Sequence, residues 1–138
     1  MRKRILAVDD SEAVRQAHFD LLTRAGYSVS LAGDGRDALS KLRSFTPDLI
    51  VLDINMPGLN GWEFLELAER EVDLDKIPVV ILSGLPETSE QARQMVARYA
   101  CYVTKKASGS DLLQIIAEIF EQQKIAAKTQ SEEGATSP

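Results

Sequence analysis

Short apolar runs alternate with amphipathic segments along this chain, and this alternation limits the possible folds more than any other feature. Mainly apolar runs predict strands over residues 5–8, 49–52, 79–82 and 101–104, and the alternation that places Val29 and Leu31 on one face predicts another over 27–32. Apolar residues recur at helical spacing after each run, over 11–25, over 35–45, and around 64–68, 92–99 and 112–120. Strands that alternate with helices form parallel sheets covered by helices. The sequence therefore predicts an α/β fold of five β-α units.

Length and charge narrow the class of protein further. A chain of 138 residues is one domain by the usual size range, and we expect that domain over residues 1–123. For residues 124–138 we expect a polar, disordered C-terminal tail, because residues 129–138 are mostly small and polar and show no hydrophobic periodicity. The net charge of −5 argues against direct nucleic-acid binding. No apolar run approaches the roughly 20 residues of a membrane span, and no signal peptide follows Met1, so we expect a cytoplasmic protein.

Polar residues follow four of the five predicted strands. They are Asp9 and Asp10 after the first strand, Asp53 after the third, Ser83 after the fourth and Lys105 after the fifth. Each has an ordinary interpretation on its own: the paired aspartates as a helix cap, Ser83 as a turn residue and Lys105 as a surface lysine. The carboxyl ends of parallel strands share one edge of the sheet, where α/β folds bind their ligands. Their joint occurrence therefore favours a single site.

The residue types at this edge indicate phosphoryl chemistry. Carboxylates that lie close together repel each other by several kcal/mol in a partly dry site, so the cluster calls for a cation. Oxygen ligands without histidine or cysteine suit a hard ion such as Mg²⁺. With a metal and the Lys105 amine to neutralise a phosphoryl group, Asp53 can accept that group as an acyl phosphate. Ser83 can then donate a hydrogen bond to a phosphoryl oxygen.

These motifs, in this order and spacing, resemble the receiver domain of response regulators over about residues 4–122, in particular the stand-alone, chemotaxis-regulator type. The resemblance implies a flavodoxin-like fold, with a five-stranded parallel sheet in the order 2-1-3-4-5 that is doubly wound with five helices. It implies that Mg²⁺ is held by Asp9, Asp10, Asp53 and the backbone carbonyl of Asn55, and that Asp53 is the phosphoacceptor. It also makes Ser83 and Tyr102 the switch residues and Lys105 the catalytic lysine.

The same resemblance implies a signalling function in a two-component phosphorelay. The phosphoryl donor would be a sensor histidine kinase or a histidine phosphotransfer protein. Phosphorylation would switch a protein-binding surface on the fourth helix, fifth strand and fifth helix. The only reactions catalysed would be the chain's own phosphorylation and dephosphorylation. One residue departs from the family pattern: Lys106 stands where a proline usually follows the lysine. Whether the Lys105–Lys106 bond is cis or trans therefore stays open.

Two other functions are compatible with parts of the sequence. Residues 33–38 fit the pattern G-x-G-x-x-A of dinucleotide-binding enzymes, with Gly33 and Gly35 in the glycine positions. This segment follows the second strand rather than the first, however, and Asp34 would repel a pyrophosphate. The other alternative is a degenerate receiver that acts as a phosphorylation-independent interaction module. Incubation with Mg²⁺ and acetyl phosphate separates that alternative from a phosphorylated receiver.

Overall fold

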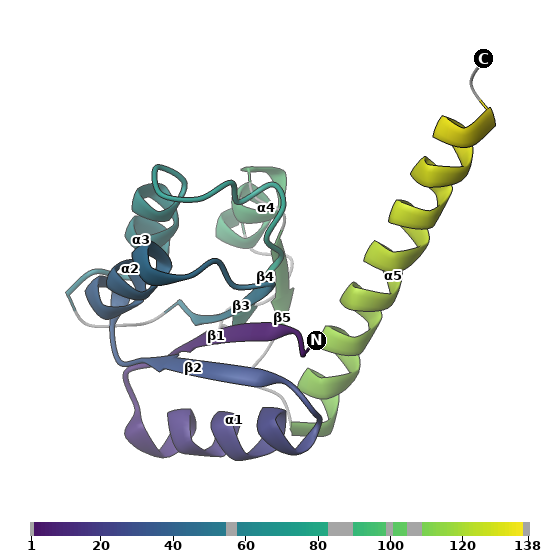
Figure 1. The fold of residues 1–138 in the computed structure, drawn as a ribbon. Helices are drawn as coiled ribbons and strands as arrows, with labels where there is room; N and C mark the ends of the chain where they lie inside the picture. Colours follow the sequence, from purple (N-terminus) through teal and green to yellow (C-terminus); the bar gives the residue numbers. More distant parts are fainter. Residues whose placement is uncertain (1, 55–57, 83–89, 99–100, 105–108, 137–138) are drawn as a thin grey trace. The chain divides into compact units, whose positions relative to one another are not determined.

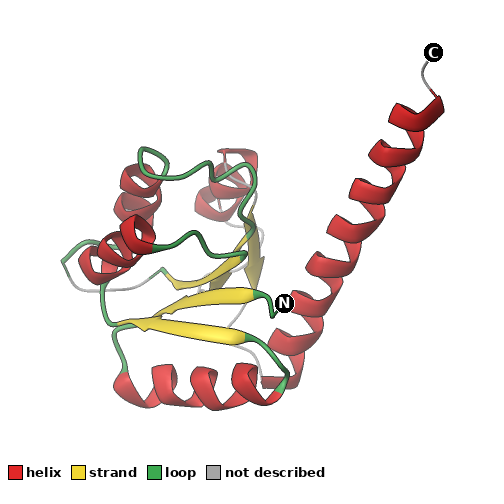
Figure 2. Ribbon diagram, viewed as in Figure 1, coloured by secondary structure: helices red, strands yellow, loops and turns green. Residues whose placement is uncertain are grey.

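The computed structural model of the chain describes residues 2–54, 58–82, 90–98, 101–104 and 109–136. The chain divides into two compact units, Met1–Ala107 and Ser108–Pro138. The first unit holds a parallel sheet and four helices, and the second holds one long helix. Figure 2 shows these elements coloured by type. The α/β class predicted from the alternating pattern is confirmed.

The sheet of the first unit contains five parallel strands in the order β2-β1-β3-β4-β5, which is the order that the resemblance implies. The strands are β1 (Arg4–Val8), β2 (Ser28–Ala32), β3 (Leu49–Asp53), β4 (Val79–Leu82) and β5 (Cys101–Thr104). Every residue of β3 and β4 is buried, which explains why these strands read as unbroken apolar runs.

Helices cover both faces of this sheet. They are α1 (Glu12–Arg24), α2 (Gly35–Ser44), α3 (Gly61–Ala68) and α4 (Glu90–Arg98). Helix α1 lies on one face, and α2, α3 and α4 lie on the other (Figure 1). The core between the layers includes Phe64 and Leu65 of α3, both without exposed surface. The full doubly wound arrangement with five helices stays a prediction, because the fifth helix belongs to the second unit.

Three helices of the first unit begin with side-chain caps at the carboxyl edge of the sheet. Ser11 Oγ accepts from the backbone N–H of Val14 at 3.3 Å and starts α1. Asp34 Oδ1 accepts from the backbone N–H of Asp37 at 2.7 Å and starts α2. Asn60 caps α3 through a reciprocal capping box with Glu63. These caps end the loops that follow the strands and so fix the surroundings of the predicted site.

The second unit is the helix α5 (Gly109–Thr136). Residues 124–136, for which we expected a disordered tail, are helical in this structure. Residues 121–129 are exposed, whereas the first half of the helix carries buried apolar residues: Leu112, Ile116, Ile119 and Phe120. Within the part of the chain that the structure describes, no helix is both long and apolar enough to span a bilayer.

Candidate metal site at the carboxyl edge of the sheet

Neighbouring strands bring two aspartates together at the carboxyl edge of the sheet. Val8 of β1 is paired with Leu52 of β3 in parallel register. The residues that directly follow them, Asp9 and Asp53, therefore lie beside each other. Both are almost completely buried, with 1% of their surface exposed. Asp10 follows in the loop to α1 and is exposed. One carboxylate oxygen from each aspartate lies within 4.8 Å of the other two.

The hydrogen bonds of Asp9 leave one of its oxygens available. Its backbone N–H donates to the carbonyl of Ala32 at 3.1 Å, and its side-chain Oδ1 accepts from the backbone N–H of Ser11 at 2.9 Å. Its backbone carbonyl accepts from Nη1 of Arg15 at 2.8 Å. Its other carboxylate oxygen, Oδ2, is buried and accepts no hydrogen bond from any residue that the structure describes. A buried carboxylate oxygen without a partner is costly, unless a cation binds it.

The three aspartates meet the chemical requirements of a magnesium site. They offer only oxygen ligands, which Mg²⁺ prefers, and they cluster tightly enough to share one ion. The orphaned Oδ2 of Asp9 gives a structural reason for an ion at this place, independent of the acidic cluster itself. When bound, Mg²⁺ would neutralise charge on the carboxylates and on an incoming phosphoryl group.

The structure brings together three of the predicted site residues, Asp9, Asp10 and Asp53. Three others, Asn55, Ser83 and Lys105, lie outside the described residues, as does Lys106. The predicted switch residue Tyr102 lies on β5, paired with Val80 of β4, and 42% of its surface is exposed. Its role as a switch stays a prediction.

Two residues that touch the site were not singled out from the sequence. Ser11 holds Oδ1 of Asp9 through its backbone N–H, and Arg15 holds the carbonyl of Asp9 through its guanidinium. The backbone contact of Ser11 has no residue-type signature. The signal for Arg15 was a basic residue in the first turns of the helix that directly follows the acidic pair.

In the glycine-containing segment that fits a dinucleotide pattern, backbone amides already donate hydrogen bonds to the carboxylates of Asp34 and Asp37. The backbone N–H of Gly33 donates to Oδ2 of Asp37 at 3.3 Å, and the N–H of Asp37 donates to Asp34. These amides are the groups that would have to bind a pyrophosphate. The loop is therefore built as a helix cap, and its geometry argues against a dinucleotide site.

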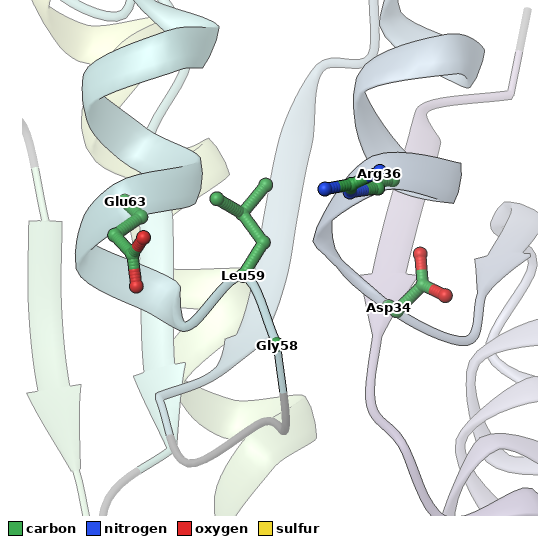
Figure 3. Close-up of a pocket in the computed structure, with 5 residues that line it drawn as sticks. All are labelled: Asp34, Arg36, Gly58, Leu59 and Glu63. Carbon is green, nitrogen blue, oxygen red and sulfur yellow. The ribbon is translucent and has the colours of Figure 1, made fainter.

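A pocket of about 400 Å³ lies beside this loop. Its lining residues are Asp34, Arg36, Gly58, Leu59 and Glu63. Leu59 lies between the first turns of α2 and α3, which carry Arg36 and Glu63 (Figure 3). A Cβ on Gly35 would lie 2.8 Å from Cδ2 of Leu59, so α2 and the segment before α3 meet at this glycine. The pocket thus adjoins the segment between Asp53 and α3.

Comparisons with known proteins agree with this fold. The family model of the response regulator receiver domain matches residues 5–117. The chain belongs to this family and is a receiver domain of two-component signalling. It is 32% identical over 110 residues to protein PilG of Pseudomonas aeruginosa, which covers 80% of this chain and 82% of PilG. The structure of the Vibrio cholerae chemotaxis protein CheY4 superposes with a TM-score of 0.76 at 31% identity, covering 86% of this chain and 98% of CheY4.

Larger proteins also contain this domain. The chain is 48% identical over 85 residues, 62% of its length, to a protein-glutamate methylesterase/protein-glutamine glutaminase of Anaeromyxobacter dehalogenans. That match covers 24% of the methylesterase. Matches to three further relatives cover 36%, 48% and 37% of their lengths. The chain thus spans less than half of the length of these relatives, and the resemblance to them concerns the receiver part.

Proposed function

We propose that this receiver domain accepts a phosphoryl group on Asp53 in a reaction that requires Mg²⁺. The donor is a phosphohistidine on a sensor histidine kinase or on a histidine phosphotransfer protein, the partners of receiver domains. The observation that carries the proposal is the orphaned, buried Oδ2 of Asp9 in a cluster whose carboxylate oxygens lie within 4.8 Å. The all-oxygen ligand set then specifies the kind of ion.

In the proposed reaction, an oxygen of the Asp53 carboxylate attacks phosphorus and forms an acyl phosphate. The bond between phosphorus and the donor imidazole nitrogen breaks and the electron pair stays on that nitrogen. The other ring nitrogen of the phosphohistidine carries a proton before transfer, so the imidazole leaves in its neutral form. Burial of Asp53 keeps bulk water away from the nucleophile. Asp9 and Asp10 hold the ion that neutralises the phosphoryl oxygens, and the predicted Lys105 would supply a second positive charge. Water later hydrolyses the acyl phosphate and restores the carboxylate.

The test is incubation of the chain with acetyl phosphate and MgCl₂, followed by intact-mass measurement. We expect the mass gain of one phosphoryl group, which EDTA and the change Asp53→Asn each abolish. Asp75→Asn is the matched control, because Asp75 is an exposed aspartate in the segment before β4. No gain in the unaltered chain would refute the proposal and favour the phosphorylation-independent interaction module.

Signal output by this chain would follow from the added charge at Asp53. In the proposal, Ser83 binds the phosphoryl group and the ring of Tyr102 turns, which changes a protein-binding surface that includes α4 and β5. Replacement of Ser83 by Ala should leave Asp53 phosphorylatable but remove the difference in partner capture between the two states. Partner capture by Ser83→Ala that still depends on phosphorylation would contradict this switch. The expected cytoplasmic location also stays a prediction.

A further inference from the structure

The guanidinium of Arg15 links the start of helix α1 to the metal site. Arg15 is half-buried, and its Nη1 donates to the backbone carbonyl of Asp9 at 2.8 Å. This bond joins a side chain of α1 to the residue that directly follows β1. It therefore fixes a point of the main chain from which two of the three clustered carboxylates extend.

Fixing the carbonyl of Asp9 restricts both neighbouring aspartates. The peptide group between Asp9 and Asp10 is planar, so a held carbonyl oxygen also sets the position of the Asp10 nitrogen. On the other side, the N–H of Asp9 is held by Ala32 and its Oδ1 by Ser11. With these groups engaged, Oδ2 is the one oxygen of Asp9 that no described residue binds. The Arg15 contact completes the set of hydrogen bonds that orients the Asp9 carboxylate.

Gly33 lies next to the guanidinium of Arg15. A Cβ built on Gly33 would lie 3.2 Å from Nη1 of Arg15, the same atom that donates to Asp9. The missing side chain at position 33 thus leaves the space that the guanidinium occupies. The backbone of Gly33 has no positive φ, so its role here is space rather than conformation.

We propose that Arg15 is a positioning residue for the magnesium site, which acts by holding the peptide between Asp9 and Asp10. This inference rests on the proposed function, because it assumes that the three aspartates bind Mg²⁺. Groups that orient metal ligands without touching the metal commonly change metal affinity by tenfold or more when they are removed.

The direction of the effect separates positioning from simple electrostatics. Arg15 carries a positive charge close to the cluster, and a positive charge repels Mg²⁺. If charge alone mattered, removal of Arg15 would tighten Mg²⁺ binding. If Arg15 positions the aspartates, its removal weakens Mg²⁺ binding despite the lost repulsion. The sign of the change therefore decides between the two effects.

The experiment is urea unfolding of the full chain over a series of MgCl₂ concentrations at constant ionic strength. The stability without metal gives the structural effect of each variant, and the increase with MgCl₂ gives its Kd for Mg²⁺. We expect Arg15→Met to raise this Kd about tenfold. Arg15→Lys, which keeps a donor and the charge, should restore a Kd closer to that of the unaltered chain. Arg24→Met, which removes an exposed arginine from the same helix, is the matched control.

A Kd for Arg15→Met equal to or below that of the unaltered chain would overturn the inference. If Arg15→Met does not fold, Gly33→Ala decides: the added Cβ should displace Nη1 from Asp9 and raise the Kd, and an unchanged Kd overturns the inference. A failure of the proposed function itself looks different, because the unaltered chain would then gain no phosphoryl mass with acetyl phosphate. A failure of the magnesium site would appear as no stabilisation of the unaltered chain by MgCl₂ that depends on Asp53.

Discussion

The backbone N–H of Gly61 donates to the carbonyl oxygen of Ile54 at 3.2 Å, so the first residue of α3 lies against the residue that follows Asp53. A Cβ on Gly61 would lie 2.5 Å from Cδ1 of Ile54 and 2.9 Å from its Cα. The second of these contacts is with the backbone and cannot be relieved by a side-chain rotation. The start of α3 is therefore in direct contact with the residue that directly follows β3.

Gly61→Ala should destabilise the fold and slow phosphorylation of Asp53. Overpacking of this kind costs about 1–3 kcal/mol, measurable as a lower free energy of unfolding in urea. Because the displaced residue is next to Asp53, acetyl phosphate should modify the variant more slowly. Gly26→Ala is the control: Gly26 has a φ of 99° and no atom within 4 Å of an added Cβ. It should lose stability through its backbone alone and keep its phosphorylation rate.

Asp9→Asn should increase stability in the absence of metal while removing stabilisation by Mg²⁺. An asparagine can still accept from Ser11 through Oδ1, and its amide replaces the orphaned oxygen with a donor beside two carboxylates. We expect the free energy of unfolding in EDTA to rise by about 1 kcal/mol. Urea unfolding with EDTA and with MgCl₂ measures both effects. A lower stability of Asp9→Asn in EDTA would show that repulsion within the cluster is not a cost in the folded state.

Removal of Arg98 should have little effect on stability. Arg98 of α4 forms an ion pair with Glu69, the C-cap residue of α3, at 2.8 Å, with a second contact to Glu66 of α3 at 3.7 Å. About half of the Arg98 side chain is exposed, and exposed pairs contribute at most about 1 kcal/mol. A double-mutant cycle with Arg98→Ala and Glu69→Gln, at low and high NaCl, measures the coupling. A coupling above this limit that persists at high salt would contradict the expectation.

Truncation after Gln123 should lower helix content without changing the stability of the fold. The removed part of α5 is helical through Thr136, and its residues up to 129 are exposed. The loss of these turns should therefore reduce the ellipticity at 222 nm, while the urea midpoint stays constant. A lower midpoint for the truncated chain would instead show that residues beyond 123 contribute to the folded core.

The strands and most helix bounds were predictable because apolar runs or the spacing of apolar residues marked each of them in the sequence. The run 49–52 is apolar without interruption, since its strand is buried on both faces. The C-terminal part of α5 was not predicted, because we took a polar segment without an apolar stripe as disordered. Residues 124–128 include lysine and alanine, which favour helix, and an existing helix extends into them without a new nucleation cost.

At the site, the residues that were predictable are those at strand ends. Asp9 and Asp53 were found because parallel strands place their carboxyl ends at one edge. The role of Arg15 was not found, because its partner is a backbone carbonyl, and any residue offers one. The sequence pattern also left Asp9 and Asp10 as possible helix caps. In the structure Ser11 takes that role for α1, and Asp9 is bound by the N–H of Ser11 instead.

The caps of α1, α2 and α3 have a consequence for how this protein can recognise an anion. Many phosphate-binding folds use the exposed amides at the amino end of a helix. Here Ser11, Asp34 and Asn60 already occupy such amides, and each of the three helices also carries an acidic residue in its first turn. A phosphoryl group on Asp53 would therefore gain little stabilisation from the dipoles of these three helices at the carboxyl edge of the sheet. Its binding would depend instead on cations and cationic side chains, and the phosphorylated state would then be sensitive to ionic strength.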